Sequence, residues 1–131
     1  MAKIETMLEP INIAATIDTP EIILDKSTGE MTFSGRSLPE DVLKIYQPVQ
    51  TWFKEYCQDP NPETEIVFNL DYYNSSTSRI IVKLLIETEK IHNHTSKVHI
   101  LWYYRANDEV MKNRGLELKS VVNLPFDMVE K

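Results

Sequence analysis

A short polar segment between two apolar runs is the feature that most constrains how this chain folds. Residues 71–79 read DYYNSSTSR; they follow the apolar run 66–70 and precede the apolar run 80–85. Runs of these lengths, meeting at a cluster of helix-start residues, predict a buried strand that ends where a helix begins. We therefore expect a strand over residues 64–71 and a helix over about residues 76–90, joined directly by this segment.

Four consecutive hydroxyl or amide side chains stand at that junction: Asn74, Ser75, Ser76 and Thr77. Such side chains accept hydrogen bonds from the unpaired N–H groups of a helix's first turn, so N-capping is their ordinary explanation. A single cap needs only one of them. The second interpretation is a hydroxyl presented at a helix start, where the helix dipole and free N–H groups also stabilise an added phosphate.

The rest of the chain predicts further strands and a βαβ unit. Residues 11–14 alternate weakly and suit an edge strand, and residues 21–25 and 30–35 flank a turn whose Gly29 suits a positive φ, which predicts a β-hairpin. The segment 98–104 is nearly continuously apolar, as in a sheet covered on both faces. With the strand at 64–71 and the helix after it, this makes a right-handed βαβ unit. A last helix is expected over about residues 108–119, interrupted by Gly115.

A helix is also predicted between the hairpin and the βαβ unit. Ser37 can cap it, and residues 39–41 suit its first turn. Its apolar stripe, which includes Trp52 and Tyr56, is typical of a buried helix face. Pro48 interrupts the pattern, so we expect a kink or two separate pieces.

These elements predict a small α/β fold in a single domain over residues 1–131. The expected architecture is a mixed β-sheet with an N-terminal hairpin and parallel central strands, packed by helices. A length of 131 residues, with 42% hydrophobic and 26% charged residues, suits one globular core. Residues 1–10 have no clear period and end at Pro10, and we treat them as a mobile arm.

Charge and composition limit the classes of partner and the cellular location that we expect. A net charge of −6 disfavours nucleic acid, which basic surfaces bind, and favours protein partners. The apolar runs are too short to span a bilayer, and the first residues lack a secretory signal, so we expect no membrane insertion and a cytoplasmic location. Cys57 is the only cysteine, and its place in an apolar helical pattern indicates a packed thiol rather than a nucleophile.

The sequence offers little for catalysis. With three glycines it contains no glycine-rich phosphate loop, and the patterns G-x-S-x-G and H-E-x-x-H do not occur. His92 and His94 lie in a polar turn without the further ligands that a closed metal site needs, and His99 falls within an apolar strand. We therefore expect no enzyme activity, no metal and no cofactor.

The polar segment also carries a family resemblance. Residues 70–79 resemble the signature of the SiaC-like regulatory phosphoproteins: leucine, any residue, tyrosine, an aromatic residue or leucine, Asn, Thr or Ser, Ser, Ser or Thr, any residue, then Lys or Arg. Other landmarks follow in the family's order at residues 18–21, 35–40, 101–104 and 124–126 and in the helix that carries Trp52. The sequence departs from the usual pattern at Ser75 (usually Thr), Leu38 (usually Tyr) and Asp41 (usually Asn). Serine at position 75 keeps the hydroxyl, but the change from threonine can alter which kinase prefers this site.

The resemblance implies a STAS-like fold, similar to the anti-sigma-factor antagonists, and a phosphorylation switch. Carried over by position, Ser75 is the phosphoacceptor. The surrounding partner surface comprises Asp71, Tyr72, Asn74, Ser76, Thr77 and Arg79. The implied partners are a SiaB-like Ser/Thr protein kinase, a SiaA-like metal-dependent Ser/Thr phosphatase and a SiaD-like diguanylate cyclase, which the unmodified form activates in cyclic di-GMP signalling.

Two other functions remain open at this stage. An adaptor would use the same surface without phosphorylation, and a lack of phosphate incorporation by a cognate kinase would favour it. A small-ligand sensor would have a deep apolar pocket lined by Tyr72 or Trp102.

Overall fold

The computed structural model describes residues 8–131, so most of the predicted N-terminal arm lies outside the described part. Six strands and three helices follow one another along that part of the chain. Their bounds are β1 Ile11–Ile13, β2 Glu21–Asp25, β3 Glu30–Ser37, α1 Val42–Tyr56, β4 Glu63–Tyr73, α2 Ser75–Glu89, β5 Lys97–Tyr104, α3 Glu109–Val121 and β6 Phe126–Glu130. The predicted edge strand, hairpin and βαβ unit are all present.

The strands form one mixed sheet in the order β1-β2-β3-β4-β5-β6. The β1–β2 and β2–β3 pairs are antiparallel, whereas β3, β4, β5 and β6 run parallel to one another. The turn between β2 and β3 needs the positive φ of +78° that Gly29 adopts. This arrangement confirms the predicted α/β class, with an antiparallel hairpin leading into a parallel centre.

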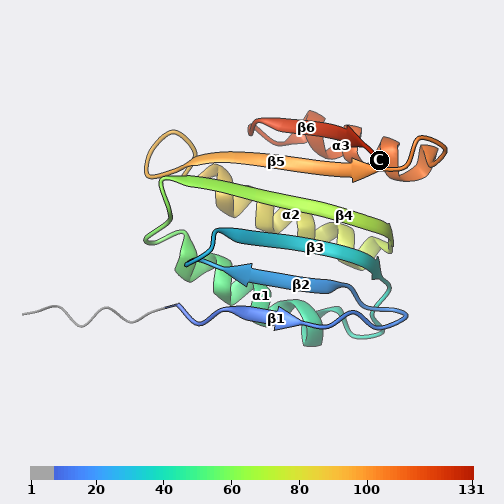
Figure 1. Ribbon diagram of the computed structural model, residues 1–131, viewed down its shortest axis with the longest axis horizontal. Helices are drawn as coiled ribbons and strands as arrows, with labels where there is room; N and C mark the ends of the chain where they lie inside the picture. Colours follow the sequence, from blue (N-terminus) through green and yellow to red (C-terminus); the bar gives the residue numbers. More distant parts are fainter. Residues whose placement is uncertain (1–7) are drawn as a thin grey trace, which may run out of the picture.

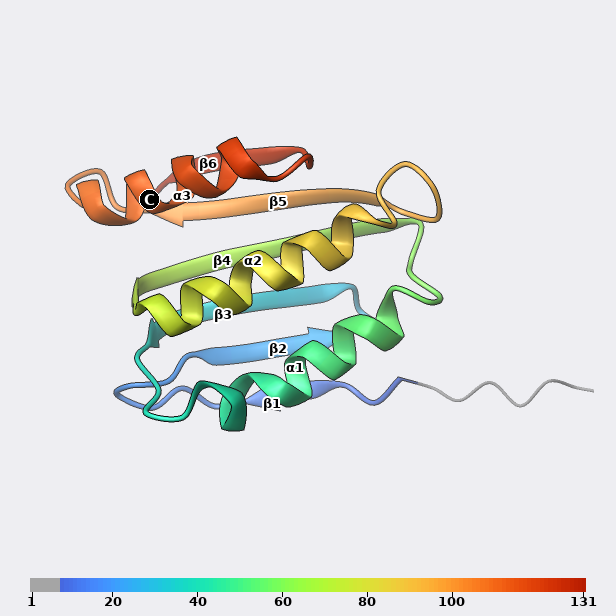
Figure 2. The ribbon, with the colours of Figure 1, turned by 180° about the vertical axis from the view of Figure 1, so that it is seen from behind.

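All three helices cover the same face of the sheet, as Figures 1 and 2 show from opposite sides. The opposite face is open, and side chains along β5 alternate between buried and half-buried. Val98, Ile100 and Trp102 point to the helices, whereas His99 and Leu101 lie on the open face. The prediction of a sheet covered on both faces is therefore wrong. The run is nearly continuously apolar because apolar residues also occupy the open face of β5. The sequence pattern does not show whether that second face is covered by other elements.

Helix α1 packs its aromatic stripe into the core, and the predicted burial of that stripe is confirmed. The prediction that Ser37 caps this helix is wrong. The N-cap is Asp41, whose carboxylate accepts a hydrogen bond from the backbone N–H of Lys44. The helix also runs through Pro48 as one element, so the alternative of two separate pieces is wrong.

Helix α3 continues through Gly115, where the sequence predicted an interruption. A Cβ at this position would lie 2.4 Å from Cδ1 of the fully buried Trp102 and 2.7 Å from Cε of Met128. The glycine therefore permits the helix to approach the sheet closely over the indole. Trp102 Nε1 donates a hydrogen bond of 2.9 Å to the carbonyl of Met111 and so fixes the helix to β5.

Candidate functional site

The polar segment lies at the edge of the sheet where the parallel strands end. β3, β4 and β5 run parallel, so their carboxyl ends meet at one edge, and α2 begins directly after β4 at that edge (Figure 2). The backbone N–H of Asn74 donates to the carbonyl of Ser37 at 3.1 Å, which ties the helix start to the end of β3. Carboxyl edges of parallel strands are where α/β folds place their functional groups.

Asn74 is the N-cap of α2. Its Oδ1 accepts hydrogen bonds from the backbone N–H of Thr77 at 3.0 Å and from Oγ of Ser76 at 2.8 Å. Its extended backbone conformation is the usual one for this position. The ordinary capping role thus belongs to Asn74, and the serine after it is not needed for that role.

Ser75 is the first residue of α2, and its side chain is exposed. The two hydroxyls that follow are already engaged: Ser76 donates to Asn74, and Thr77 is fully buried. The expectation that Ser76 uses its hydroxyl locally is confirmed. The same expectation for Thr77 is wrong, because its hydroxyl bonds to Ser37, which lies forty residues earlier in the chain. Ser75 is therefore the exposed residue at this helix start, whereas Ser76 and Ser78 are half-buried and Thr77 is buried.

A buried hydroxyl cluster lies beneath this helix start. Ser37 Oγ lies 2.7 Å from the Tyr46 hydroxyl and 2.8 Å from Thr77 Oγ1, so β3, α1 and α2 meet through three hydrogen-bonding side chains. Burial raises the pKa of Tyr46, and its bonds to Ser37 and Thr77 oppose that rise. The phenol therefore stays neutral. The cluster holds the helix start in place from below, while Ser75 faces outward.

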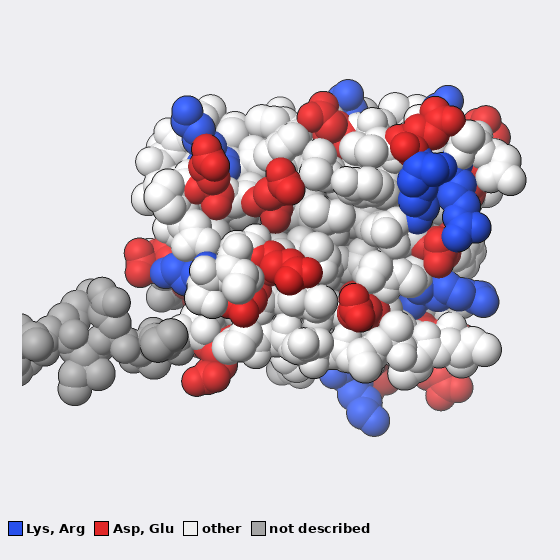
Figure 3. Space-filling model, in the orientation of Figure 1, with Lys and Arg blue, Asp and Glu red and all other residues white. Residues whose placement is uncertain are grey.

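Charged side chains flank the segment on the open face. Asp71 Oδ1 lies 3.8 Å from Arg105 Nη2 and 3.8 Å from Lys131 Nζ. Figure 3 shows Lys and Arg side chains gathered at this end of the open face, where the parallel strands end. These pairs are solvent-exposed and add little stability, so their main effect is on the local electrostatic potential. Tyr72 is 40% exposed, and Arg79 is exposed one helical turn after Ser75.

Arg114 of α3 reaches the same region from the helix side. Its guanidinium carbon lies 4.6 Å from the ring centroid of Tyr73 and 5.5 Å from that of Tyr72. Burial raises the pKa of the Tyr73 phenol, and the adjacent Arg114 charge and Ser78 hydroxyl oppose that rise. Sequence reasoning missed Arg114, Arg105 and Lys131, because their approach depends on how distant strands and helices pair.

Cys57, His92 and His99 lie in surroundings typical of structural residues. Cys57 is half-buried, and desolvation raises its thiol pKa to about 11, which disfavours the reactive thiolate. His92 Nδ1 accepts a hydrogen bond from the backbone N–H of Val98 at 3.0 Å. His99 Nε2 lies 2.7 Å from Asp127 Oδ2, and His99 Nδ1 lies 3.8 Å from Glu65 Oε2. Those carboxylates lie on opposite sides of the ring and do not converge on one metal position. Within residues 8–131, no set of three or more His, Cys, Asp or Glu side chains is arranged to hold a metal ion.

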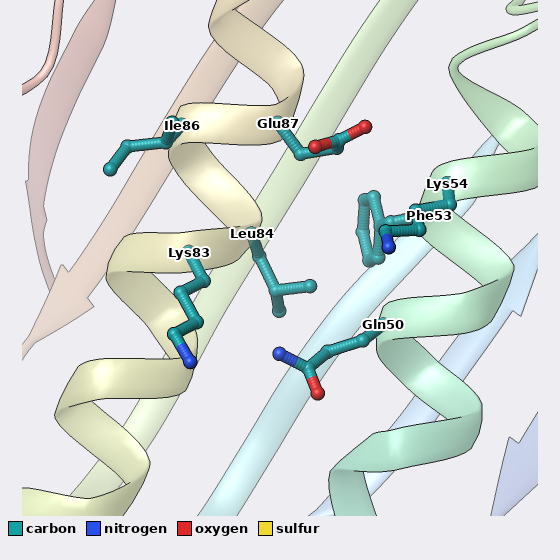
Figure 4. A pocket seen from close by; sticks show the side chains of 7 residues that line it. All are labelled: Gln50, Phe53, Lys54, Lys83, Leu84, Ile86 and Glu87. Atoms are coloured by element: carbon teal, nitrogen blue, oxygen red, sulfur yellow. The ribbon is translucent and has the colours of Figure 1, made fainter.

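A groove of about 360 Å³ lies between α1 and α2. Phe53 and Leu84 point toward one another across it (Figure 4). Its lining residues are Gln50, Phe53, Lys54, Lys83, Leu84, Ile86 and Glu87. Neither Tyr72 nor Trp102 lines this groove, and Trp102 is fully buried in the core, so the groove lacks the lining expected of the sensor alternative.

Among the helices of residues 8–131, none is long and apolar enough to cross a membrane.

The fold and the site together define a small regulatory domain. Its distinguishing surface is an exposed serine hydroxyl on a firmly capped helix start, beside a cluster of cationic side chains. A sequence model of the SiaC family regulatory phosphoproteins matches residues 13–131. The chain belongs to the SiaC family, and it is a regulatory protein rather than an enzyme.

Individual relatives agree with this assignment. A curated but uncharacterized protein of Pseudomonas aeruginosa (strain UCBPP-PA14) is 24% identical over 119 residues, which cover 91% of this chain and 94% of that protein. The solved structure of SiaC of Pseudomonas aeruginosa superposes with a TM-score of 0.85 at 23% identity, over 94% of this chain and 99% of that one. A crystal structure of the diguanylate cyclase SiaD in complex with its activator SiaC, also from Pseudomonas aeruginosa, gives a TM-score of 0.86 at 24% identity, over 92% of this chain and 99% of the matched chain. At these identities the structural matches establish the shared fold.

Proposed function

We propose that this chain is a phosphorylation-switched activator of a diguanylate cyclase, with Ser75 as the phosphoacceptor. The observation that carries the proposal is that the polar side chains at the start of α2 have different roles. Asn74 caps the helix, the Ser76 hydroxyl bonds to Asn74, and the Thr77 hydroxyl is buried against Ser37. Ser75 is the exposed residue of these three hydroxyl residues. A kinase can therefore modify Ser75 without first disturbing the helix start.

The effector follows from the relatives. The similar SiaC of Pseudomonas aeruginosa is described as the activator of the diguanylate cyclase SiaD. By family membership, the unmodified form of this chain binds and activates such a cyclase in the cytoplasm, and so acts in cyclic di-GMP signalling. A SiaB-like Ser/Thr kinase adds the phosphate, and a SiaA-like metal-dependent phosphatase removes it.

Phosphorylation of Ser75 acts by excluding the modified site from the interface with the cyclase. A phosphate adds about −1.5 to −2 charge at neutral pH, and the dipole and free N–H groups of the first turn of α2 stabilise it there. Arg79 lies one turn further along the helix and can pair with it. A partner matched to a bare hydroxyl offers this anion no counter-charge of its own, so burying the anion in the interface costs several kcal/mol. Affinity then falls by orders of magnitude while the fold persists.

Two measurements test the proposal. The first is intact-mass analysis with fragment-ion mapping of the protein from its native cell, with and without phosphatase treatment, which should place one phosphate on Ser75. The second is titration calorimetry of the modified and unmodified forms against the diguanylate cyclase of the same organism. Phosphate on Ser76 or Thr77, or equal affinity of the two forms, would overturn the proposal. Binding with no phosphate in any preparation would favour the adaptor function.

A further inference from the structure

The guanidinium of Arg114 is a cation held in place without an anionic partner. It lies over the rings of Tyr73 and Tyr72 at 4.6 Å and 5.5 Å, and these contacts restrict where the side chain can go. Its Nε is buried and makes no hydrogen bond. Throughout residues 8–131, no carboxylate forms an ion pair with it, although Asp71 pairs with both Arg105 and Lys131 nearby. A half-buried guanidinium that is held by two rings and has an unpaired Nε is suited to receive an anion.

The face of α2 that carries Ser75 is turned toward α3. Ser75 and Ser78 are three residues apart, so they are neighbours on one helix face, roughly 5–6 Å apart. The Ser78 hydroxyl and Arg114 both lie beside the Tyr73 phenol. Further along the same face, Glu89 Oε1 accepts a 2.7 Å hydrogen bond from the backbone N–H of Asn123, just after α3. Arg114 therefore lies beside the phenol that Ser78 also contacts, and Ser78 is the neighbour of Ser75 on this helix face.

We propose that Arg114 receives the phosphate on Ser75, and that stacking on Tyr73 and Tyr72 positions its guanidinium for this role. The inference rests on the proposed function, since it concerns the phosphorylated form of the same site. Arg79 approaches the phosphate from within α2, and Arg114 approaches it from α3. The planar guanidinium fork matches two phosphate oxygens at once, which a lysine at the same position does not. The modified helix start is then linked to α3, and the phosphate is fixed in one orientation.

The test uses the full chain with phosphoserine installed at position 75 by codon reassignment, so it needs neither kinase nor partner. Phosphorus NMR measures the second pKa of the phosphate as a function of pH. Pairing with a guanidinium favours the dianion, so we expect Arg114→Gln to raise this pKa by about half a unit to one unit. Lys112→Gln removes the same charge from a position two residues away on α3, which does not face the same side of the helix. This control should leave the phosphate pKa unchanged.

A second readout covers the case in which Arg114→Gln fails to fold. Arg114→Lys keeps the charge and the aliphatic stem but loses the fork, and its phosphate should be removed several-fold faster by a non-specific phosphatase than that of the parent. The proposal is overturned if Arg114→Gln matches Lys112→Gln in phosphate pKa, or if Arg114→Lys matches the parent in dephosphorylation rate. Such results would leave Ser75 as the phosphoacceptor, whereas native mass mapping that finds no phosphate there would remove the proposed function itself.

Discussion

The hydroxyl of Thr77 lies 2.8 Å from that of Ser37, a residue forty positions earlier in the chain. Both side chains are fully buried, and the Tyr46 hydroxyl completes the cluster at 2.7 Å from Ser37. This contact joins the start of α2 to the end of β3. It holds the helix start from below, on the side away from the exposed Ser75.

Thr77→Val should destabilise the protein because it removes the hydroxyl from this buried cluster. The replacement keeps the shape of the side chain, so the loss reflects hydrogen bonding, on the order of 1–3 kcal/mol. Ser37 keeps its bond to Tyr46, which places the expected value in the lower half of that range. Urea unfolding followed by tryptophan fluorescence measures the change. Ser76→Ala serves as the control, since its half-buried hydroxyl bonds only locally, and an equal loss in that control would contradict this reasoning.

Asn74→Ala and Ser75→Ala should differ in their effect on stability. Asn74 accepts two hydrogen bonds as the N-cap, and its loss should cost about 0.5–2 kcal/mol. Ser75 is exposed and does not cap α2, so Ser75→Ala should stay within about 0.5 kcal/mol of the parent. Thermal melts of both variants decide this. Gross unfolding of Ser75→Ala would show that the residue is mainly structural and would weaken the case for a switch.

Gly115→Ala should destabilise the packing of α3 on β5. The added methyl would meet the Trp102 ring at 2.4 Å and 2.6 Å, and the rigid, fully buried indole cannot move aside cheaply. Overpacking of this kind costs about 1–3 kcal/mol, more than the helix propensity gained by replacing glycine. Denaturant unfolding and the Trp102 fluorescence spectrum should both change. Leu116→Ala, at the exposed neighbouring position, is the control and should have a smaller effect.

The thiol of Cys57 should react with iodoacetamide slowly and only at high pH in the folded protein. Its pKa is raised from 9.0 to about 11, mainly by burial, and a rise of about two units lowers the thiolate fraction near neutral pH roughly a hundredfold. Because the folded-state pKa is the higher one, folding favours the neutral thiol. That contribution to stability is present below about pH 9 and is lost as the pH rises through about 11. The alkylation rate against pH checks this, with protein unfolded in urea as the reference. A native profile with its midpoint near 9 would contradict it.

The local parts of the fold were predictable from sequence because their causes are local. Alternation and a turn glycine predicted the β2–β3 hairpin, and the polar segment after the apolar run predicted where β4 ends and α2 begins. The errors concern features that depend on distant packing. Gly115 is tolerated inside α3 because the Trp102 ring occupies the space of a side chain, and no local pattern contains that information.

The site was predictable in part for the same reason. The row of four polar side chains marked the helix start, but the residues alone did not separate the cap from the exposed hydroxyl. Pairing of β3 with β4 brings Ser37 beneath Thr77, and packing of α3 brings Arg114 over Tyr73. These contacts arise only when the sheet is assembled. A lone arginine in a mid-helix position therefore gave no signal in the sequence.

Phosphorylation of Ser75 should alter the protein locally. The buried bonds of Thr77 and the cap at Asn74 hold the helix start on the side away from Ser75, so the added charge has no need to displace it. Amide NMR shifts should be confined to the start of α2, the end of β4 and the part of α3 around Arg114. Phosphoserine installed at Ser27, in the exposed β2–β3 turn, is a control for the general effect of added charge. Its shifts should stay near that turn, and it should leave binding to the cyclase unchanged. Shifts that spread across the whole sheet on modification of Ser75 would mean that the switch works by rearrangement of the fold and not by exclusion at the interface.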